Sequence, residues 1–119
     1  MINLSEIPYF DGHCDTIWRC MYGEPAACGG LRENNGHLDL LRSGRYGRRA
    51  QFFALFDNAA TLPSGPVWPH LCAMHRWFQE QLAANGDMAV LCRTGGEVDD
   101  AVSAGRTAAL LSIEGADLL

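Results

Sequence analysis

The sequence predicts an α/β fold in which parallel strands present functional side chains at their carboxyl ends. Three observations favour this class. Short apolar runs alternate with segments of helical periodicity. The run over 50–56 is apolar apart from Gln51, which is typical of a strand covered on both faces. Residues able to bind a metal ion follow two of the expected strands.

Four strands are expected, over about 9–13, 50–56, 88–92 and 108–113. The first ends in polar residues, and the others are apolar runs of strand length. The last two flank a helical segment, so 88–113 predicts a strand–helix–strand unit. Its two strands should pair in parallel through a right-handed crossover.

Two helices are expected between these strands. The segment 70–84 carries one apolar stripe at helical spacing, formed by Leu71, Met74, Phe78 and Leu82. The Asn-Gly pair at 85–86 is a good stop signal for this helix. Thr94 and Glu97 have the spacing of a capping box, which predicts that a second helix begins there. The proline-rich segment 61–69 predicts a surface connection.

The 119-residue chain carries 9 Lys and Arg against 14 Asp and Glu, a formal net charge of −5. This acidic balance argues against nucleic acid or an anionic membrane as the main partner, since both need a basic surface. No run of about 18 apolar residues occurs, so no transmembrane helix is expected. The first residues lack Lys and Arg, so no secretory signal is expected.

Five cysteines occur, an odd number without any C-x-x-C spacing. This pattern fits neither a disulfide framework nor a zinc finger. It predicts reduced thiols in a cytoplasmic protein, with Cys72 and Cys92 packed as small apolar side chains. The alternative is a catalytic thiol, for which Cys14 beside His13 offers the one local base.

His13 and Asp15 form the sharpest local feature. They lie at the carboxyl end of the first expected strand at a spacing of two, so on an extended chain their side chains share one side. An imidazole and a carboxylate placed in this way can hold one divalent ion at about 2.0–2.2 Å. The alternative is a histidine that is hydrogen-bonded to a neighbouring aspartate.

Glu114 follows the apolar strand over 108–113 and precedes a glycine. A carboxylate at the mouth of a buried strand needs an ionic partner, a hydrogen bond or a metal ion. A glutamate can bridge two ions about 3.5–4 Å apart, an arrangement that produces hydroxide at neutral pH. The alternative is an acidic residue at the start of a following helix, where the helix dipole favours it.

Other polar residues have simpler interpretations. His70 and His75 lie about 140° apart around a helix, so they form no chelating pair and a solvated or capping role is expected. His37 and Asp39 lie in a segment rich in glycine and asparagine, where a structural turn is favoured. Gln51 needs a partner if it is buried, either a backbone group or the ligand shell.

A small basic cluster is formed by Arg45, Arg48 and Arg49. A solvated loop is expected there, and recognition of an anionic substrate group is the alternative. The glycine-rich segments lack both G-x-G-x-x-G and the P-loop pattern, so nucleotide binding is unsupported.

Three motifs resemble, in order and spacing, those of the membrane (renal-type) dipeptidases, peptidase family M19. The segment 11–16 (DGHCDT) resembles the family's D-G-H-x-D opening. The segment 37–54, with Asp39, Gly44 and the Gln-Phe-Phe run at 51–53, is similar to the family's second-strand region. The segment 105–115 is similar to the pattern G-K-x-A-x-x-x-x-x-E-G. Together the three matches cover nearly the whole chain.

The resemblance implies a (β/α)8 TIM barrel of the amidohydrolase type with two zinc ions. It implies that His13 and Asp15 bind one ion and that Glu114, the implied catalytic carboxylate, bridges both. The implied activity is that of a metallo-dipeptidase, which often accepts a D-residue at the C-terminal position. A metal-bridging hydroxide would attack a carbonyl polarised by zinc. Cys14 stands where many relatives carry asparagine, and its side chain is expected to point away from the ligands.

A TIM barrel needs about 250 residues. The resemblance therefore assigns 1–119 to one partial domain, about the first four strands, with the C-terminal half of the barrel absent. Two further zinc-binding histidines and the substrate-binding groups are expected from later strands, since His37, His70 and His75 do not match the family's positions. The chain is thus expected to be inactive alone and to need a missing half or a second copy. The alternatives are another amide or ester hydrolase of the amidohydrolase type and a non-catalytic remnant.

A half barrel also predicts low stability. A closed barrel has no sheet edges, whereas a half leaves an open edge, expected here at 108–113, and exposes the barrel-facing side chains. Apolar strands in water promote aggregation, and a short chain buries a smaller share of its surface. We therefore expect the isolated chain to be poorly stable or to self-associate.

Overall fold

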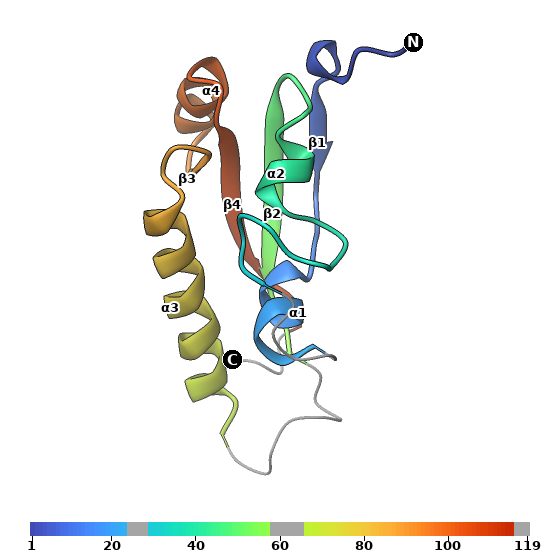
Figure 1. Cartoon of the computed structure of the whole chain (residues 1–119). Helices are drawn as coiled ribbons and strands as arrows, with labels where there is room; N and C mark the ends of the chain where they lie inside the picture. The colour runs from blue at the N-terminus through green and yellow to red at the C-terminus, as the bar shows by residue number, and fades with distance from the viewer. Residues whose placement is uncertain (24–28, 58–65, 116–119) are drawn as a thin grey trace.

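A four-stranded parallel sheet organises the chain (Figure 1). The computed structural model describes residues 1–23, 29–57 and 66–115. The strands are β1 (Tyr9–Asp11), β2 (Arg49–Leu55), β3 (Ala89–Leu91) and β4 (Thr107–Ile113). Each of the three pairings is parallel. The predicted α/β class and all four expected strands are thereby confirmed, although β1 ends two residues earlier than expected.

Helices connect and cover the strands. A 3-10 turn (η1, Leu4–Glu6) precedes β1, and the helices are α1 (Thr16–Tyr22), α2 (Leu40–Ser43), α3 (Trp68–Ala84) and α4 (Gly95–Ser103). The helix α3 begins two residues before the expected start, because a proline fits the first turn of a helix. The predicted surface connection over 61–69 is therefore shorter, and its residues 61–65, like Cys28, lie outside the described residues.

The capping box of α4 forms as predicted. The Thr94 hydroxyl accepts a hydrogen bond from the Glu97 backbone N–H at 3.2 Å. The Glu97 carboxylate in turn accepts from the Arg93 N–H at 2.6 Å, one residue before the N-cap. These bonds satisfy backbone donors that the start of a helix otherwise leaves unpaired.

The order of the strands differs from the prediction. The sheet runs β1-β2-β4-β3, so β4 lies inside it and the expected open edge at 108–113 is wrong. After β2, the long helix α3 leads to the short outer strand β3, which leaves one strand position open beside β2. The helix α4 then leads back to this position, which β4 fills. A right-handed crossover fixes the hand of such a connection but not whether the next strand is added on the near or the far side.

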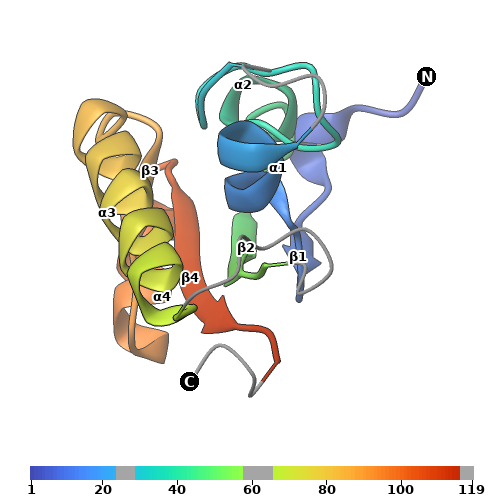
Figure 2. The same ribbon diagram turned by 90° about the horizontal axis from the view of Figure 1, so that it is seen from below.

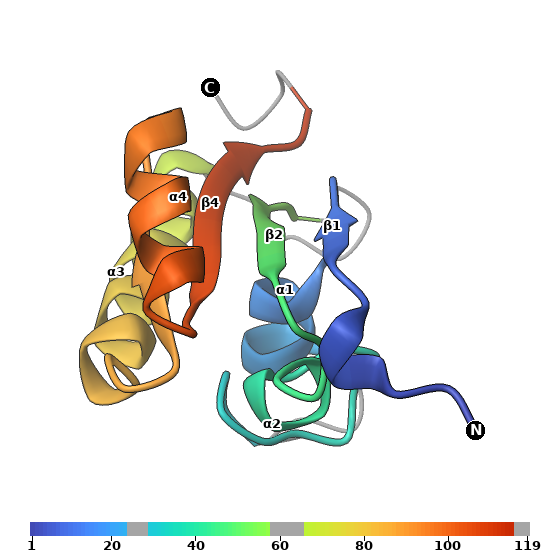
Figure 3. The same cartoon turned by 90° about the horizontal axis from the view of Figure 1, so that it is seen from above.

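The helices cover both faces of the sheet. Ala108 and Ala109 are neighbours on β4, so their side chains point to opposite faces. Ala109 packs in the larger core cluster with residues of α1 and α3, whereas Ala108 packs in a second cluster with Ala101 of α4. Figure 2 shows α1 beside β2, and Figure 3 shows α4 alongside β4. The described residues therefore show a parallel α/β sheet with helices on both faces, and the expected half of a TIM barrel, whose helices form one outer ring, stays a prediction.

The larger core lies between β2 and α3. The four residues of the predicted stripe on α3 are all buried: Leu71, Met74, Phe78 and Leu82. The rings of Phe53 and Phe78, both fully buried, lie with centroids 5.1 Å apart. The amphipathic pattern of the sequence therefore identified the face of α3 that meets the sheet.

One apolar surface is left open on the face of β1 and β2 that carries Phe10 and Phe52. Phe10 is 69% exposed and packs edge-on against Phe52, with ring centroids 5.9 Å apart. An uncovered aromatic pair on a sheet favours self-association, which stays a prediction for this chain. Within the described ranges, every helix is too short or too polar to cross a membrane.

The segment before β2 is held by a buried aspartate. Asp39 is the N-cap of α2, and its carboxylate accepts from the Arg42 backbone N–H and from the Arg42 Nε, both at 2.7 Å. Its carboxylate also accepts from the Asn34 N–H at 3.3 Å. The predicted structural turn at His37 and Asp39 is thereby confirmed. Burial by itself would raise the pKa of Asp39, but these bonds outweigh it and hold the pKa below its usual value.

This lowered pKa makes stability depend on acid. A carboxyl whose folded pKa is depressed contributes stability above its unfolded pKa of about 3.9, and the contribution is lost as pH falls through the folded value. We expect Asp39→Asn to be less stable than the unsubstituted chain at pH 6 and to lose less stability between pH 5 and pH 2. Urea denaturation midpoints measured at pH 6, pH 5 and pH 2 test both expectations. The exposed ion pair of Asp87 with Arg32 supplies the control, since Asp87→Asn should change little. An identical acid response of all three proteins would contradict the assignment.

Candidate metal site

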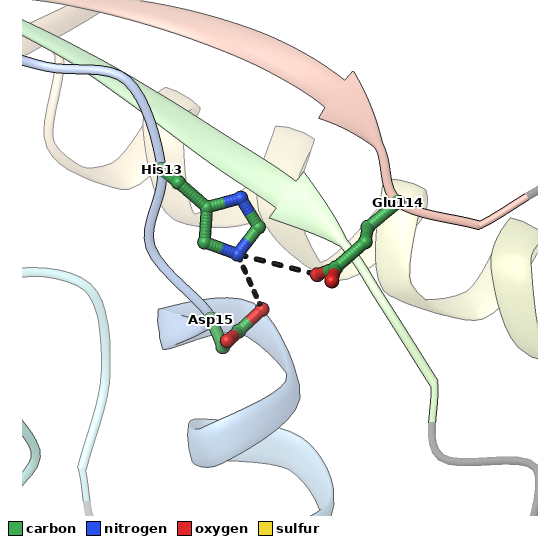
Figure 4. A group of neighbouring side chains, drawn as sticks. All are labelled: His13, Asp15 and Glu114. Atoms are coloured by element: carbon green, nitrogen blue, oxygen red, sulfur yellow. Dashed lines mark hydrogen bonds and ion pairs between the residues drawn. The ribbon is translucent and has the colours of Figure 1, made fainter.

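Two strands that flank β2 carry the candidate site at their carboxyl ends. His13 follows β1, Asp15 is the N-cap of α1, and Glu114 directly follows β4. Because β1 and β4 run parallel on either side of β2, their ends meet at one edge of the sheet. Figure 4 shows the three side chains converging from these segments.

Backbone hydrogen bonds hold both segments against the end of β2. The Ala54 N–H donates to the Cys14 carbonyl at 3.0 Å, and the Glu114 N–H donates to the Leu55 carbonyl at 3.0 Å. These bonds continue the parallel pairing beyond the ends of β1 and β4. The separation of the site residues is therefore set by main-chain pairing as well as by the side chains.

The ligand atoms have spacings that suit one cation. The His13 Nε2 lies 3.1 Å from an Asp15 carboxylate oxygen and 3.2 Å from a Glu114 carboxylate oxygen. Candidate ligand atoms of all three residues lie within 4.8 Å of one another. Atoms bound about 2.1 Å from one ion lie about 3.0–3.4 Å apart in octahedral or tetrahedral geometry.

The alternative of a simple hydrogen-bonded histidine explains less of this geometry. One Nε2 faces two carboxylates, and a single N–H makes one good hydrogen bond. Two carboxylates brought together also repel each other unless a cation, either a metal ion or a protonated imidazole, lies between them. Asp15 occupies an N-cap position but makes no capping hydrogen bond with its side chain, which is turned to His13 instead. The donor set thus fits a divalent metal ion.

The site is open to water. His13, Asp15 and Glu114 are each 47% exposed at the side chain. A catalytic metal keeps a position for water or substrate, whereas a structural metal is enclosed by four protein ligands. The alternative role of Glu114 at the start of a following helix concerns residues 116–119, which lie outside the described part of the chain.

Cys14 points away from the site, as predicted. Its thiol donates to the Phe52 carbonyl at 3.3 Å and packs against the larger core cluster. Burial raises the pKa of the Cys14 thiol, and the nearby carboxylates of Asp11 and Asp15 add to the shift. A raised pKa lowers the thiolate fraction, so the structure disfavours the alternative of a catalytic cysteine at this position. The expected burial of Cys92 is confirmed, whereas Cys72 is only half-buried.

The remaining histidines do not belong to the three-residue group of candidate ligands, although His37 borders the hollow beside it. His70 was expected to be solvated or capping, which is wrong: its Nδ1 lies 3.3 Å from a carboxylate oxygen of the buried Asp57, and its ring packs on Tyr22. The sequence offered no spacing signal for this pair, because Asp57 and His70 come from separate elements. His75 borders an apolar hollow between α3 and β4.

The basic cluster separates into two kinds of residue. Arg45 and Arg48 are exposed, as expected of a loop. Arg49 is buried, donates to the backbone carbonyls of Tyr46 and Gly105, and reaches the Thr107 hydroxyl at 3.1 Å. It ties the amino ends of β2 and β4 together at the opposite end of the sheet. The alternative of an anionic substrate contact is therefore wrong for Arg49.

A hollow of about 680 Å³ adjoins the site between the tip of β1, α1 and the segment 34–38. Trp18 and Phe56 give it an apolar wall and meet edge-on with centroids 6.3 Å apart. Asn35 and His37 also line it. A space of this size beside candidate ligands suits a small organic ligand.

Fold and geometry together define a parallel α/β chain with a candidate metal site at the carboxyl ends of its strands. No protein-family model matches the chain, and no curated protein matches it. Among solved structures, the chain is similar to a metallo peptidase from Rhodobacter sphaeroides, determined with a phosphinate mimic of the dipeptide L-Ala-D-Ala. The TM-score is 0.66 at 21% sequence identity. The match covers 96% of this chain and 40% of that one, so this chain spans about two fifths of the peptidase's length. At this identity the similarity establishes a shared fold.

Proposed function

We propose that the chain provides the first metal ligands of a metal-dependent hydrolase that acts on dipeptides. The observation that carries this proposal is the convergence of one imidazole and two carboxylates at the carboxyl edge of a parallel sheet. The fold shared with a metallo peptidase crystallised with a dipeptide mimic supports the same class of reaction. The resemblance of three motifs to those of the membrane dipeptidases supports it from the sequence.

The proposed metal is zinc, in a pair of ions. His13 and Asp15 would hold one ion, and Glu114, with two carboxylate oxygens, would contact both. Zinc bound there would lower the pKa of a water molecule and polarise a substrate carbonyl. Asp15 and Glu114 offset the positive charge, and neutral His13 provides a nitrogen lone pair. The exposure of all three leaves room for water and substrate.

We propose further that β1, β2 and β4 are three neighbouring strands of a parallel barrel, with β3 as a side strand. In-order parallel pairing and a shared carboxyl edge support this. The two further zinc-binding histidines and the groups that bind the dipeptide would come from additional strands or a second copy of the chain. A cytoplasmic location is proposed from the reduced cysteines, and the net charge of −5 supports a partner other than nucleic acid or membrane.

A non-catalytic remnant is the second candidate. The described residues offer one group of three ligands, and this favours weak binding of a metal over turnover. Binding of a transition-state mimic separates the two candidates, because it requires a metal with free positions but no catalysis.

The test uses a phosphinate mimic of a dipeptide, whose tetrahedral anion resembles hydrated peptide. Isothermal calorimetry compares the zinc-loaded chain with the chelator-treated chain and with Glu114→Gln. We expect zinc-dependent binding that Glu114→Gln abolishes. A simple dialkyl phosphinate without peptide termini is the control ligand, and we expect it to bind with similar affinity because the groups that bind the dipeptide would come from additional strands. Absence of binding to zinc-loaded chain would support the remnant and contradict the dipeptidase.

A further inference from the structure

We propose that Tyr9, Gln51 and Asp11 form a polar relay, centred on the buried Gln51, that positions His13 for metal binding. This inference rests on the proposed metal site and assigns the three residues a positioning role, not a catalytic one. None of them belongs to the group of candidate ligands.

The relay is a continuous chain of hydrogen bonds across two strands. The Tyr9 hydroxyl lies 2.7 Å from the Gln51 Oε1, and the Gln51 Nε2 lies 3.0 Å from a carboxylate oxygen of Asp11. The other carboxylate oxygen of Asp11 accepts from the His13 backbone N–H at 3.1 Å. Because Asp11 pairs with Gln51 in the β1–β2 register, the strands themselves set these positions.

The direction of the bonds follows from the acceptors around Gln51. Its Nε2 also lies 2.9 Å from the Phe52 carbonyl, so two acceptors surround this atom and it must be the amide nitrogen. The Oε1 is then left to accept from the Tyr9 hydroxyl. Burial raises the pKa of Tyr9 to about 12, so the phenol keeps its proton at neutral pH.

The burial of Gln51 shows that these partners are needed. Its side chain is fully buried on a strand whose other members between Ala50 and Leu55 are apolar. A buried amide without partners costs about 1–3 kcal/mol, so a core position of this kind normally holds an apolar residue. If Gln51 only had to satisfy its own amide group, the hydrogen bond to the neighbouring Phe52 carbonyl would be enough. The bond to Asp11 connects Gln51 to the segment that presents His13.

The relay restrains the His13 segment from one side, and the main chain restrains it from the other. The Asp11 carboxylate holds the His13 N–H, and the Ala54 N–H holds the next carbonyl, that of Cys14. His13 is thereby fixed at its backbone while its ring is 47% exposed. A residue so restrained loses less freedom when it binds a metal, which raises affinity without a direct contact.

The experiment compares Gln51→Leu and Tyr9→Phe with the unsubstituted chain. Two quantities are measured: the hydrogen-exchange rate of the His13 amide without metal, and the Kd for zinc by competition with a chromophoric chelator. We expect faster exchange of the His13 amide in both variants. We expect the zinc Kd to rise about 10–100-fold in Gln51→Leu, as is typical when a group that orients a ligand is lost, and less in Tyr9→Phe.

Thr107→Val is the matched control. Thr107 is buried on the same sheet, but its hydroxyl bonds to Arg49 at the opposite end. We expect this variant to lose stability while its zinc Kd and His13 exchange rate stay unchanged. An unchanged zinc Kd in both relay variants, or an equal rise in Thr107→Val, would overturn the proposal. If the unsubstituted chain binds no zinc, the proposed metal site fails, whereas the metal-free exchange rates still show whether the relay holds His13.

Discussion

Replacing His13 by alanine is expected to raise the Kd for zinc by at least about 100-fold. Structural zinc sites bind with about 12 kcal/mol shared by four ligands, so one ligand contributes about 3 kcal/mol. Glu114→Gln should show a comparable loss, because it keeps the size of the side chain and removes the charge that attracts the ion. Competition with a chromophoric chelator, followed at fixed pH, measures both.

The controls for this prediction are residues of the same type outside the site. His37→Ala removes an exposed imidazole from the segment 34–38, and Glu80→Gln removes an exposed carboxylate from α3. Both should bind zinc as the unsubstituted chain does. Equal losses in His13→Ala and His37→Ala would mean that zinc binds through scattered surface groups, and the ligand assignment would be wrong.

Replacing Phe53 by alanine should lower the free energy of unfolding by about 4 kcal/mol. Phe53 is fully buried on β2 and packs against Phe78, so the substitution removes apolar contacts and leaves a cavity. Small domains are stable by only about 5–15 kcal/mol, so Phe53→Ala should bring this chain close to unfolding at 25 °C. Urea denaturation followed by circular dichroism measures the loss.

Phe10→Ala is the matched control for Phe53→Ala. It is the same substitution on the neighbouring strand, at a side chain that is 69% exposed. Its effect on the unfolding free energy should stay below about 1 kcal/mol. Sedimentation should also show less self-association, because the open aromatic pair with Phe52 is removed. Similar losses of stability in the two variants would show that the core does not lie between β2 and α3.

The fold class and the elements could be predicted from local patterns, but their arrangement could not. The stripe on α3 and the capping box at Thr94 depend on neighbours within a few residues. The place of β4 between β2 and β3 depends on where the 17-residue helix α3 ends relative to the sheet. No residue of β3 or β4 determines this position through its local sequence. The strand Ala89–Leu91 is apolar in either position.

The candidate site was predictable for a different reason. His13 and Asp15 follow β1 and Glu114 follows the apolar strand β4, and parallel strands bring such positions to one edge. The relay was missed because Tyr9 and Gln51 lie within strands, where a polar residue signals only that some partner exists. Which partner it has depends on the register between β1 and β2, and that register is a tertiary property.

Zinc-edge anomalous diffraction from zinc-soaked crystals of the chain tests the metal site most directly. We expect an anomalous peak about 2.0–2.2 Å from the His13 Nε2 and from carboxylate oxygens of Asp15 and Glu114. A peak only at other residues, or no peak within reach of these three side chains, would contradict the site and the dipeptidase proposal that depends on it.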